Sequence, residues 1–500
     1  MTRDTDGCYL GIDVGTSATR VSLVNEEGSI VANASVSYPS YRREGGIVEQ
    51  DPGEWLDALA AALNRIGIAH RPLTGIGLCG QTPTVVLVDV SGAPVAPALT
   101  WQDTRATSEA RELAHLFGDP EVIFGTALPW SAVNVPAKLL WLSRFAPEDC
   151  LNTRWVLQPK DFIGMALTGS PASDPWCSKG LCRVTDGAPV GEVLEACGWS
   201  TKCCPPMADA WSVRGIVSEA AAARFGLPSG VPVSVGWSDA LSQTLAAGCF
   251  NRSSAFMFSG TSSIVGSPVC EEGARAEGLF SVPKTCAPCA LLFGPTQSSG
   301  ASIEWVARIL GCAPADIPAL AATARGSIPT FVPYLAGERT PIWNDNVRAL
   351  LLGLSDSHGR AEIARAVVLG VFLSARHVLD VVEQATAQAI EEVDVVGRGV
   401  GDPAWEAIAL NAMRVPLRFH EDPDMSVRGA TMLAAAASGV DLLDASRQLS
   451  DSSRLIRPDS SDVEASKAML SVYRRAGEIA LGWTNERAIW EEGYSWFRPA

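Results

Sequence analysis

A turn between two apolar runs near the N-terminus constrains the fold of this chain more than any other feature. Residues 9–24 read YLGIDVGTSATRVSLV, which predicts two strands joined by a tight turn that carries Asp13, Gly15, Thr16 and Ser17. Backbone N–H groups and hydroxyls at such a turn can face a phosphate, and the carboxylate of Asp13 can reach a hydrated Mg²⁺. The turn predicts a nucleotide site, although an ordinary hairpin has the same pattern.

A second copy of this pattern lies about half a chain further on. Residues 255–265 read AFMFSGTSSIV, an apolar run followed by Gly260, Thr261 and Ser262 and then by apolar residues again. Two hydroxyl-bearing hairpins in the two halves of the chain predict a duplicated α/β fold, with the halves facing each other across a cleft.

The length of the chain also indicates two domains. Five hundred residues exceed what one hydrophobic core usually organises, and 47% apolar with 19% charged residues are values typical of a globular protein. We place the domains at residues 1–247 and 248–500, so that each contains one copy of the hairpin.

The charge of the chain excludes some ligands and sites. A formal net charge of −16 argues against a nucleic-acid surface, because there is no basic stripe to replace counterions along a phosphate backbone. No G-x-x-x-x-G-K-[ST] motif is present, which excludes a P-loop as the phosphate cradle. Any ATP would be held by local amides, hydroxyls and a metal rather than by the overall field.

The N-terminal residues show no apolar signal region, and no run of 18 apolar residues occurs. These absences predict a cytoplasmic protein with no membrane partner. The 13 cysteines are then expected to be reduced, small apolar residues, and the single C-x-x-C at 286–289 has no second pair at zinc-binding spacing.

Residues 101–105, Trp-Gln-Asp-Thr-Arg, follow a predicted strand. The indole of Trp101 can lie against the C–H faces of a polyol, while the charges of Asp103 and Arg105 bind its hydroxyls. The alternative is a buried Trp101 beside Asp103 as the cap of a helix over 104–117. The pattern does not separate these two interpretations.

A predicted strand has the residues Gly236-Trp-Ser-Asp239 at its C-terminal end, so that it finishes on an acid. Because α/β folds place catalytic groups at strand ends, Asp239 is the candidate general base. The competing interpretation makes Asp239 an ordinary N-cap of the helix over 240–248.

The second half contains two further stretches suited to a nucleotide. Residues 298–305, SSGASIEW, begin a helix whose small residues permit close approach, and residues 394–402, DVVGRGVGD, place a glycine-rich turn after a strand. Between them, residues 360–392 predict one long helix.

These blocks, taken in chain order, resemble the FGGY family of carbohydrate kinases, which includes xylulokinase, ribulokinase, gluconokinase and glycerol kinase. The resemblance spans about residues 9–439, nearly the whole chain. Its blocks are Asp13-x-Gly15-Thr16-Ser17-x-x-Arg20, Trp101-x-Asp103-x-Arg105, Lys138-Leu-Leu-Trp-Leu142, Asp239, Gly260-Thr261-Ser262 and Pro333-Tyr-Leu-x-Gly-Glu-Arg-Thr-Pro341. The last block is the most specific of them.

The resemblance implies two ribonuclease-H-like domains of the actin-like ATPase type with a central cleft, the sugar on the first and ATP on the second. It assigns the general base to Asp239 and the support of Mg²⁺ to Asp13. The residues that it places around the nucleotide are Thr16, Ser17, Arg20, Gly260, Thr261, Ser262, Gly300, Glu304, Gly397 and Gly399.

The residues expected to contact the sugar match neither of two patterns found in the family. Gln81 and Thr82 stand where xylulokinases commonly carry a Met-His pair that touches the sugar and where glycerol kinases carry Arg-Glu. Together with Trp101, Asp103 and Asp239 they form the expected sugar site. Two other blocks depart from the family pattern. In the glycine-rich adenosine block, Arg398 replaces the middle one of three successive glycines, and in the signature formed by residues 349–354 and the long helix, Leu369 stands where an acid is usual.

The sequence therefore predicts ATP-dependent phosphorylation of a hydroxyl of a small sugar, first a pentulose such as D-xylulose. Kinases for gluconate, glycerol or a tetritol are the near alternatives. An actin-like ATPase or nucleotide switch without sugar kinase activity is the alternative of another class. A homodimer is left open.

Overall fold

The computed structural model describes residues 7–271, 273–458 and 463–493, and the chain forms two compact units. The first contains the chain up to Arg252 together with Val282–Cys289 and Asp424–Asp451. The second contains Ser253–Ser281, Ala290–Pro423 and the chain from Ser452 onward. This division differs from the contiguous boundary at 247/248, because the segment 424–451 belongs with the N-terminal half.

The first unit is built on a sheet with the strand order β10-β11-β6-β1-β2-β3. Strands β1 and β2 are antiparallel, as are β2 and β3, whereas β1, β6 and β11 run parallel. The strands of the unit are β1 (Cys8–Val14), β2 (Ala18–Asn25), β3 (Ile30–Ser37), β4 (Tyr41–Arg43), β5 (Ile47–Gln50), β6 (Leu73–Gly80), β7 (Val86–Val88), β8 (Ala98–Leu99), β9 (Trp155–Leu157), β10 (Val213–Ile216), β11 (Pro232–Ser234) and β12 (Trp237–Ser238).

The second unit repeats this arrangement in the order β15-β16-β14-β13-β19-β20-β21. Here β13, β14 and β16 form the antiparallel part, and β13, β19 and β20 run parallel. Its strands are β13 (Ala255–Ser259), β14 (Ser263–Val269), β15 (Phe280–Val282, which crosses from one unit to the other), β16 (Ala290–Thr296), β17 (Thr330–Val332), β18 (Leu350–Leu352), β19 (Val393–Gly397), β20 (Leu417–His420) and β21 (Ser453–Ile456).

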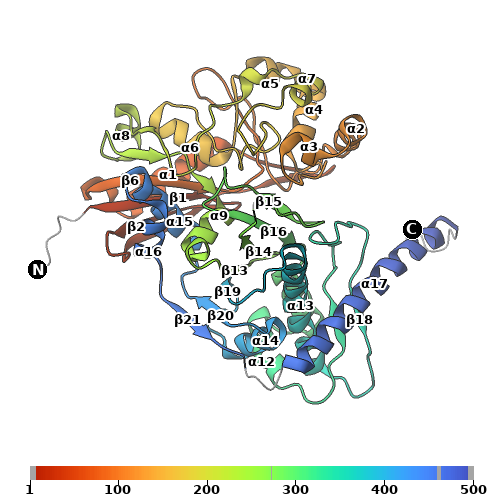
Figure 1. Ribbon diagram of the computed structural model, residues 1–500. Helices are drawn as coiled ribbons and strands as arrows, with labels where there is room; N and C mark the ends of the chain where they lie inside the picture. The colour runs from red at the N-terminus through yellow and green to blue at the C-terminus, as the bar shows by residue number, and fades with distance from the viewer. Residues whose placement is uncertain (1–6, 272, 459–462, 494–500) are drawn as a thin grey trace, which may run out of the picture. The chain divides into compact units, whose positions relative to one another are not determined.

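Both units therefore contain three antiparallel strands followed by parallel strands on the other side of the first, the ribonuclease-H-like order. The two predicted hairpins occupy equivalent places, as the turns β1–β2 and β13–β14. The amide of Gly15 donates to the carbonyl of Ala18, and the amide of Gly260 donates to the carbonyl of Ser262, so both turns are closed internally. The predicted α/β class and the duplication are confirmed (Figure 1).

Helix α15 (Met425–Ala437) covers the first sheet at close range. The backbones of β1 and β6 present Gly11, Gly75 and Gly77 to it, and a Cβ at Gly77 would lie 1.8 Å from the carbonyl oxygen of Ala430. A larger residue in this strip would push the helix away, so glycine is required for backbone contact rather than for a turn. The small residues of the helix thus pack against strands whose facing residues are also small.

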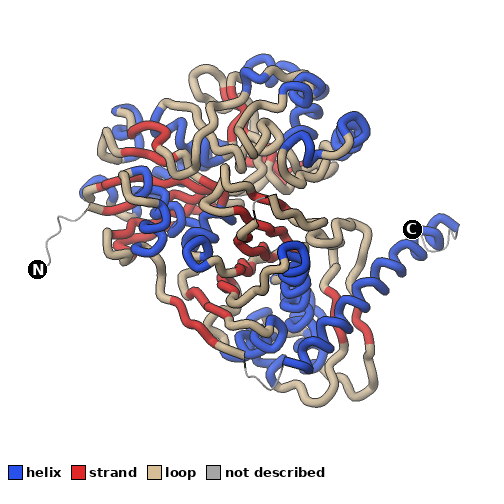
Figure 2. The backbone as a smooth tube through the Cα atoms, in the orientation of Figure 1, coloured by secondary structure: helices blue, strands red, loops and turns tan. Residues whose placement is uncertain are grey.

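Other helices of the first unit surround its sheet and its upper loops. Trp55, Leu59 and Leu63 of α1 are buried, and Asp51 caps this helix by accepting from the amide of Gly53, as predicted. The helices are α1 (Pro52–Arg65), α2 (Thr107–Phe117), α3 (Pro120–Phe124), α4 (Val135–Phe145), α5 (Pro147–Asn152), α6 (Pro159–Thr168), α7 (Gly191–Ala196), α8 (Glu219–Phe225), α9 (Asp239–Ala246), α10 (Cys249–Arg252), α15 (Met425–Ala437) and α16 (Leu442–Gln448), with short 3₁₀ turns at Ile68–His70 and Thr201–Cys203. Figure 2 shows that loops make up much of the region around α4 to α7.

The second unit packs its helices around the long α13. Val367, Phe372 and Leu379 lie in its buried face, within one hydrophobic core. The helices are α11 (Gly300–Leu310), α12 (Ile317–Ala322), α13 (Arg360–Thr386), α14 (Pro403–Met413) and α17 (Val463–Gly493), with a 3₁₀ turn at Pro314–Asp316. The prediction of one helix over 360–392 is wrong at its end, because Ala387 adopts a left-handed conformation (φ 52°) that stops it.

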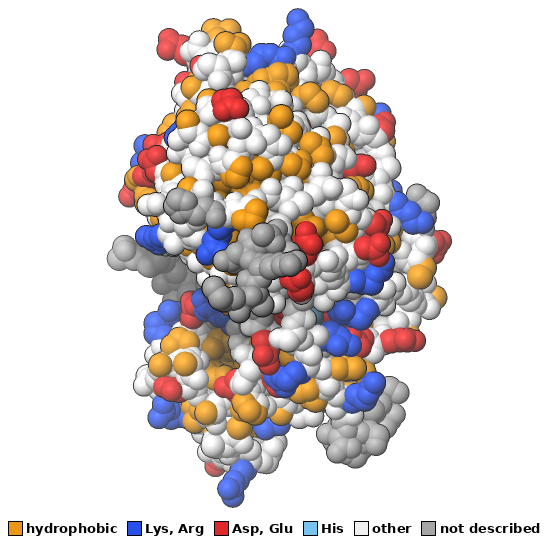
Figure 3. Space-filling view, turned by 90° about the vertical axis from the view of Figure 1, so that its left-hand side faces the viewer, with side chains coloured by type: hydrophobic (Ala, Val, Ile, Leu, Met, Phe, Trp, Pro, Cys, Tyr) orange, Lys and Arg blue, Asp and Glu red, His pale blue; other side chains and the backbone are white. Residues whose placement is uncertain are grey.

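The surface carries mixed charges. On the face drawn in Figure 3, Lys and Arg side chains alternate with Asp and Glu rather than forming a stripe of one sign. Among the described residues no single helix has the length and apolar character to cross a membrane, although the bent pair Gly300–Leu310 and Pro314–Ala322 passes that test jointly. Ile303, Val306 and Ala307 of this pair are buried in the core of the second unit.

Candidate active site

The candidate site residues fall into two groups, one in each unit. In the first, Asp13 is the last residue but one of β1 and is 1% exposed. Its Oδ2 accepts hydrogen bonds from Ser426 Oγ at 2.7 Å and from Arg20 Nη1 at 3.3 Å, whereas its Oδ1 is buried with no hydrogen-bond partner among the described residues. Arg20 also pairs with Asp424 at 3.4 Å. One carboxylate oxygen is therefore held by hydrogen bonds within the protein, and the other is buried without one.

Asp239 is the first residue of α9, directly after β12, which pairs with β6. The cap of this helix is Ser238, whose hydroxyl accepts from the amide of Leu241, so the interpretation of Asp239 as the N-cap is wrong. The Oδ1 of Asp239 accepts from the amide of Ala240 at 2.7 Å. Burial and the negative charge of Asp13 raise its pKa to about 7, which is suited to a group that exchanges a proton near neutral pH.

The same site contains a lysine that the sequence did not indicate. Lys179 is buried, donates to the carbonyl of Trp176 at 3.1 Å and lies 4.6 Å from the centre of the Trp176 ring. Burial lowers its pKa, and its charge acts on Asp239. It lies in the Cys- and Trp-rich stretch 175–213, whose pattern predicted no regular element, and no local signal distinguishes it there.

A hydrogen-bonded network joins the first hairpin to the predicted sugar residues. The indole Nε1 of Trp101 donates to Thr16 Oγ1 at 3.1 Å, and Gln50 Nε2 donates to the carbonyl of Thr16 at 2.6 Å. Gln81 Nε2 donates to Gln50 Oε1 at 2.8 Å, and the buried Oε1 of Gln81 has no partner among the described residues. Gln50, which sequence reasoning missed, is thus the centre of the network. Ser17 is exposed at the tip of the turn.

The remaining predicted sugar residues are already engaged by the protein. Thr82 donates to Gln158 Oε1 at 3.2 Å. Asp103 is fully buried, forms a bidentate pair with Arg105, and accepts from the amide of Val48 at 2.8 Å. Helix α2 begins at Thr107 with no side-chain cap, so the alternative of Asp103 as a cap for 104–117 is wrong.

Lys138, on α4, holds the loops that carry these residues. Its ammonium is buried and donates to the carbonyls of Thr100 at 2.7 Å, Leu99 at 3.3 Å and Pro83 at 3.4 Å. Burial lowers its pKa to about 7. The lysine of the Lys-Leu-Leu-Trp-Leu block is therefore a scaffold for the loops that bear Thr82 and Trp101.

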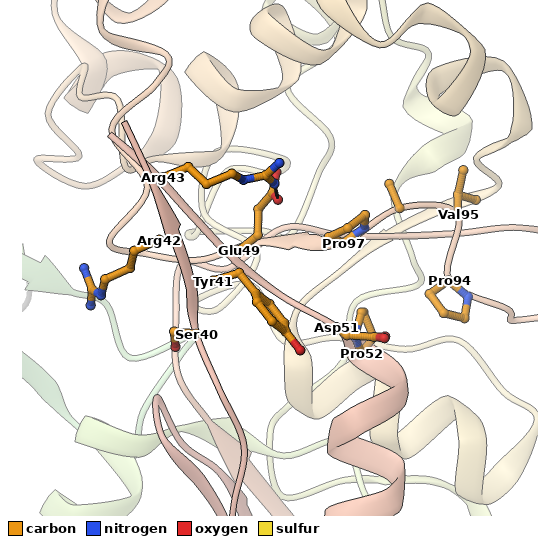
Figure 4. Close-up of a pocket in the computed structure, with 11 residues that line it drawn as sticks. Ser40, Tyr41, Arg42, Arg43, Glu49, Asp51, Pro52, Pro94, Val95 and Pro97 are labelled. Carbon is orange, nitrogen blue, oxygen red and sulfur yellow. Dashed lines mark hydrogen bonds and ion pairs between the residues drawn. The ribbon is translucent and has the colours of Figure 1, made fainter. Parts of the chain in front are cut away.

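A separate pocket of the first unit lies between the β4–β5 hairpin and the loop 94–97 (Figure 4). It has a volume of about 840 Å³ and is lined by residues such as Tyr41, Arg43 and Pro97. Arg43 pairs with Glu49, and Glu49 also binds Arg105 at 2.7 Å. None of the predicted site residues lines this pocket, so it is distinct from the candidate site.

In the second unit, the hairpin Gly260–Ser262 meets the beginning of α11. The amides of Ser299 and Ala301 donate to the carbonyl of Thr261, and the amide of Gly300 donates to that of Gly260, each at 3.0 Å. A Cβ at Gly300 would lie 2.5 Å from the Gly260 carbonyl oxygen. The structure thus brings the predicted phosphate turn and Gly300 together, and explains why residue 300 is a glycine.

The glycine-rich turn after β19 lies beside the same hairpin, because Ser259 of β13 pairs with Gly397 of β19. A Cβ at Gly397 would meet the Ser259 carbonyl at 2.1 Å, and one at Gly399 would meet the Trp405 indole at 2.4 Å. Glu304 of α11 forms an exposed ion pair with Arg398 at 2.6 Å. The glycines are thus required by packing within the protein, and Arg398 has a partner on α11.

Comparisons with known proteins identify the family. Residues 8–246 match the N-terminal domain, and residues 255–438 the C-terminal domain, of the FGGY family of carbohydrate kinases. The chain belongs to the FGGY family of carbohydrate kinases. A xylulose kinase of Klebsiella pneumoniae is 31% identical over 86% of this chain and 90% of its own, and a gluconokinase of Bacillus subtilis is 23% identical over 97% and 98%. The crystal structure of a xylulose kinase from Rhodospirillum rubrum matches with a TM-score of 0.87 and 25% identity, covering 96% of this chain and 100% of that chain.

Members of the FGGY family are ATP-utilising carbohydrate kinases, so the chain is a phosphotransferase whose acceptor is an alcohol group of a carbohydrate. Both FGGY domains and nearly the full length are present, which agrees with the two sheets described above. The alternative of an actin-like ATPase without sugar kinase activity is therefore not supported.

Proposed function

We propose that this FGGY kinase transfers the γ-phosphoryl group of ATP to a hydroxyl of a pentulose, D-xylulose first. The observation that carries the proposal is the placement of Asp239 at the head of α9, in the same unit as Asp13 with its buried, unpartnered oxygen. Relatives named xylulose kinase support the choice of sugar.

We assign the role of general base to Asp239. Its carboxylate takes the proton of the attacking hydroxyl as the sugar oxygen bonds to the γ-phosphorus, and the bond from that phosphorus to the β–γ bridging oxygen breaks, which releases ADP. A pKa near 7 leaves a large fraction of the carboxylate ionised at neutral pH and makes the later return of the proton to water easy. The neighbouring charges of Lys179 and Arg20 favour the ionised form.

We assign Mg²⁺ support to Asp13. The buried, unpartnered Oδ1 fits this role, since an acid oxygen without a donor is the group that a hard cation or its water would satisfy. No cluster of three or more metal-ligating side chains occurs within the described part of the chain, which suits Mg²⁺ because it is usually held by one or two carboxylates and substrate phosphates. The ion would neutralise charge on the transferring phosphoryl group.

We further propose that the first unit holds the sugar, near Gln81, Thr82, Trp101 and Asp103, and that the second holds the nucleotide. The exposed Gly260–Ser262 turn beside Gly300, Glu304, Gly397 and Gly399 supports the second assignment. Phosphoryl transfer depends mainly on positioning and charge stabilisation, and hydroxyls, amides and a metal supply both.

A coupled assay of ADP release tests the proposal. The purified chain is given ATP, Mg²⁺ and, in separate reactions, D-xylulose, D-ribulose, D-gluconate, glycerol or erythritol. ADP release is expected to depend on the sugar and to be fastest with D-xylulose. Release that is equal with and without every sugar would contradict the proposed function.

Gluconate is the second candidate, because the gluconokinase of Bacillus subtilis matches over 97% of this chain. Gluconate carries a carboxylate that a pentulose lacks. A higher kcat/KM for gluconate than for D-xylulose in the same assay would therefore identify gluconate as the substrate. The proposed kinase mechanism would be unchanged.

A further inference from the structure

A buried glutamate outside the predicted site, Glu338, fixes the segment that precedes α11 in the second unit. Glu338 lies between β17 and β18 and is 1% exposed. Its Oε1 accepts hydrogen bonds from the amide of Gln297 at 2.5 Å and from its neighbour Arg339 at 2.9 Å. Its Oε2 is buried with no hydrogen-bond partner among the described residues.

The residues around Glu338 fasten one loop to the end of β16. Arg339 Nη2 donates to the carbonyl of Thr296 at 3.0 Å, and the amide of Thr340 donates to the carbonyl of Pro295 at 3.1 Å. Together with the bond from Gln297, these contacts bind three consecutive residues of one segment to three consecutive residues of the other. The position of residue 297 is therefore set by the 338–340 segment.

Residue 297 leads directly into the start of α11, which contacts the Gly260–Ser262 hairpin. The next residues form the beginning of α11, where Ser299 and Gly300 donate their amides to Thr261 and Gly260. Because there is no space for a Cβ at Gly300, a displacement of this segment cannot be absorbed there and is passed on to the hairpin.

The local hydrogen bonds fix Glu338 independently of the nucleotide loop. Its backbone amide and carbonyl pair with Asn344 at 3.0 and 2.8 Å, and Gly337, with φ 81°, packs against Asp345. A carboxylate buried with one unsatisfied oxygen lowers the free energy of unfolding relative to an apolar residue that fills the same space. Stability alone therefore does not explain this residue.

We propose that Glu338 is a positioning residue for the nucleotide, which acts through Gln297 and the start of α11 on the Gly260–Ser262 hairpin. The proposal rests on the proposed assignment of that hairpin to the phosphates of ATP. Glu338 itself touches no reacting atom in this role.

The protonation state of Glu338 offers a specific readout. Burial raises its pKa to about 7, partly offset by the two amides and by the charge of Arg339; Tyr334 and Tyr473 are the other titratable groups that face it. An ionised carboxylate accepts an N–H more strongly than a neutral carboxyl does. Nucleotide binding should therefore tighten as the pH rises through 7.

Two substitutions test the proposal. Glu338→Gln keeps the size and one acceptor oxygen but removes the charge, and Glu338→Ala removes the acceptor. The matched control is Glu362→Gln at the start of α13, because Glu362 also accepts two backbone amides, those of Arg325 and Gly359, each at 3.0 Å. The dissociation constant of Mg·ADP by calorimetry, KM for ATP, KM for the sugar and the melting temperature are measured at pH 6 and pH 8.

We expect Glu338→Ala to raise the ADP dissociation constant and KM for ATP on the order of 10-fold, with KM for the sugar unchanged within about two-fold. For Glu338→Gln, the ratio of its dissociation constant to that of the wild-type protein should be larger at pH 8 than at pH 6. Taking this ratio cancels the titration of the nucleotide itself. Glu362→Gln should leave both constants at the wild-type values.

A folded Glu338→Gln protein whose ratio is the same at both pH values, with constants equal to those of Glu362→Gln, would overturn the proposal. This criterion holds even if Glu338→Ala does not fold. Failure of the proposed function looks different, because ADP release by the wild-type protein would then be equal with and without every sugar, whatever Glu338→Gln does to the binding of Mg·ADP.

Discussion

The indole Nε1 of Trp101 donates a 3.1 Å hydrogen bond to the hydroxyl of Thr16, 85 positions earlier in the chain. Thr16 lies in the first hairpin, and Trp101 lies in the loop whose preceding residue, Thr100, accepts a hydrogen bond from Lys138. The bond therefore connects the first hairpin, which is predicted to face the phosphates, with a residue of the predicted sugar site, and both lie in one unit.

Breaking this hydrogen bond should lower the catalytic efficiency of the enzyme with both the sugar and ATP. Trp101→Phe keeps most of the ring surface and removes the donor, so we expect kcat/KM for the sugar to fall about 3- to 10-fold, as for the loss of one neutral hydrogen bond. Thr16→Val should have a similar effect in steady-state assays.

The double variant provides the control. If the bond between the two side chains is responsible, Trp101→Phe combined with Thr16→Val should cost little more than either change alone. Fully additive losses would mean that each residue acts through other contacts.

Removing the proposed base should abolish most turnover without unfolding the protein. We expect Asp239→Asn to lower kcat by roughly 10²-fold or more, because the sugar hydroxyl then has no acceptor for its proton. Sugar binding, measured by calorimetry, should be retained. Asp186→Asn, which breaks an exposed ion pair with Arg183 in the same unit, is the control and should keep full activity.

The pH dependence of the reaction should follow Asp239. Since a general base must be ionised and its pKa lies near 7, kcat/KM for the sugar should rise between pH 6 and 7 and level off above about pH 8. A profile that is flat from pH 5 to 8 would contradict the assignment. Stopped assays across this range, with saturating ATP and Mg²⁺, supply the measurement.

Stability should depend on pH through Lys138. Its pKa is lowered to about 7 in the folded protein from the usual value of 10.5, so between these two values the unfolded chain binds more protons. The free energy of unfolding should therefore rise with pH in this window, on the order of 1 kcal/mol per unit.

The comparison with Lys138→Met isolates this contribution. Urea unfolding of both proteins at pH 7, 8 and 9 should show the wild-type midpoint rising relative to that of the variant. A constant difference between the two midpoints would show that the buried ammonium keeps its proton throughout.

The parts of the fold that depend on local pattern could be predicted from the sequence. The two hairpins, the cap of α1 at Asp51 and the glycine-rich turn after β19 each follow from residues adjacent in the chain. The place of Asp239 at the head of a helix also follows, although its neighbour Ser238 provides the cap.

The contacts that complete the site could not be predicted, because they join residues far apart in sequence. Ser426, which binds Asp13, lies 413 positions away, and Gln50 gains its role only when β5 lies beside the first hairpin. Lys179 lies in a stretch without periodicity. The prediction that Gly397 and Gly399 line the nucleotide came from the chain pattern, which could not show that a Cβ at these positions would also meet Ser259 and Trp405.

The cover that α15 provides for the glycine strip of β1 and β6 has a consequence for biosynthesis. Strand β6 ends at Gly80, but the helix that shields these strands ends at Ala437, much later in the chain. A ribosome-bound chain must therefore carry an unfinished sheet until α15 has also been synthesised. Maturation of the first unit waits for the second, and a gene split at the midpoint would yield an N-terminal product with a bare sheet face.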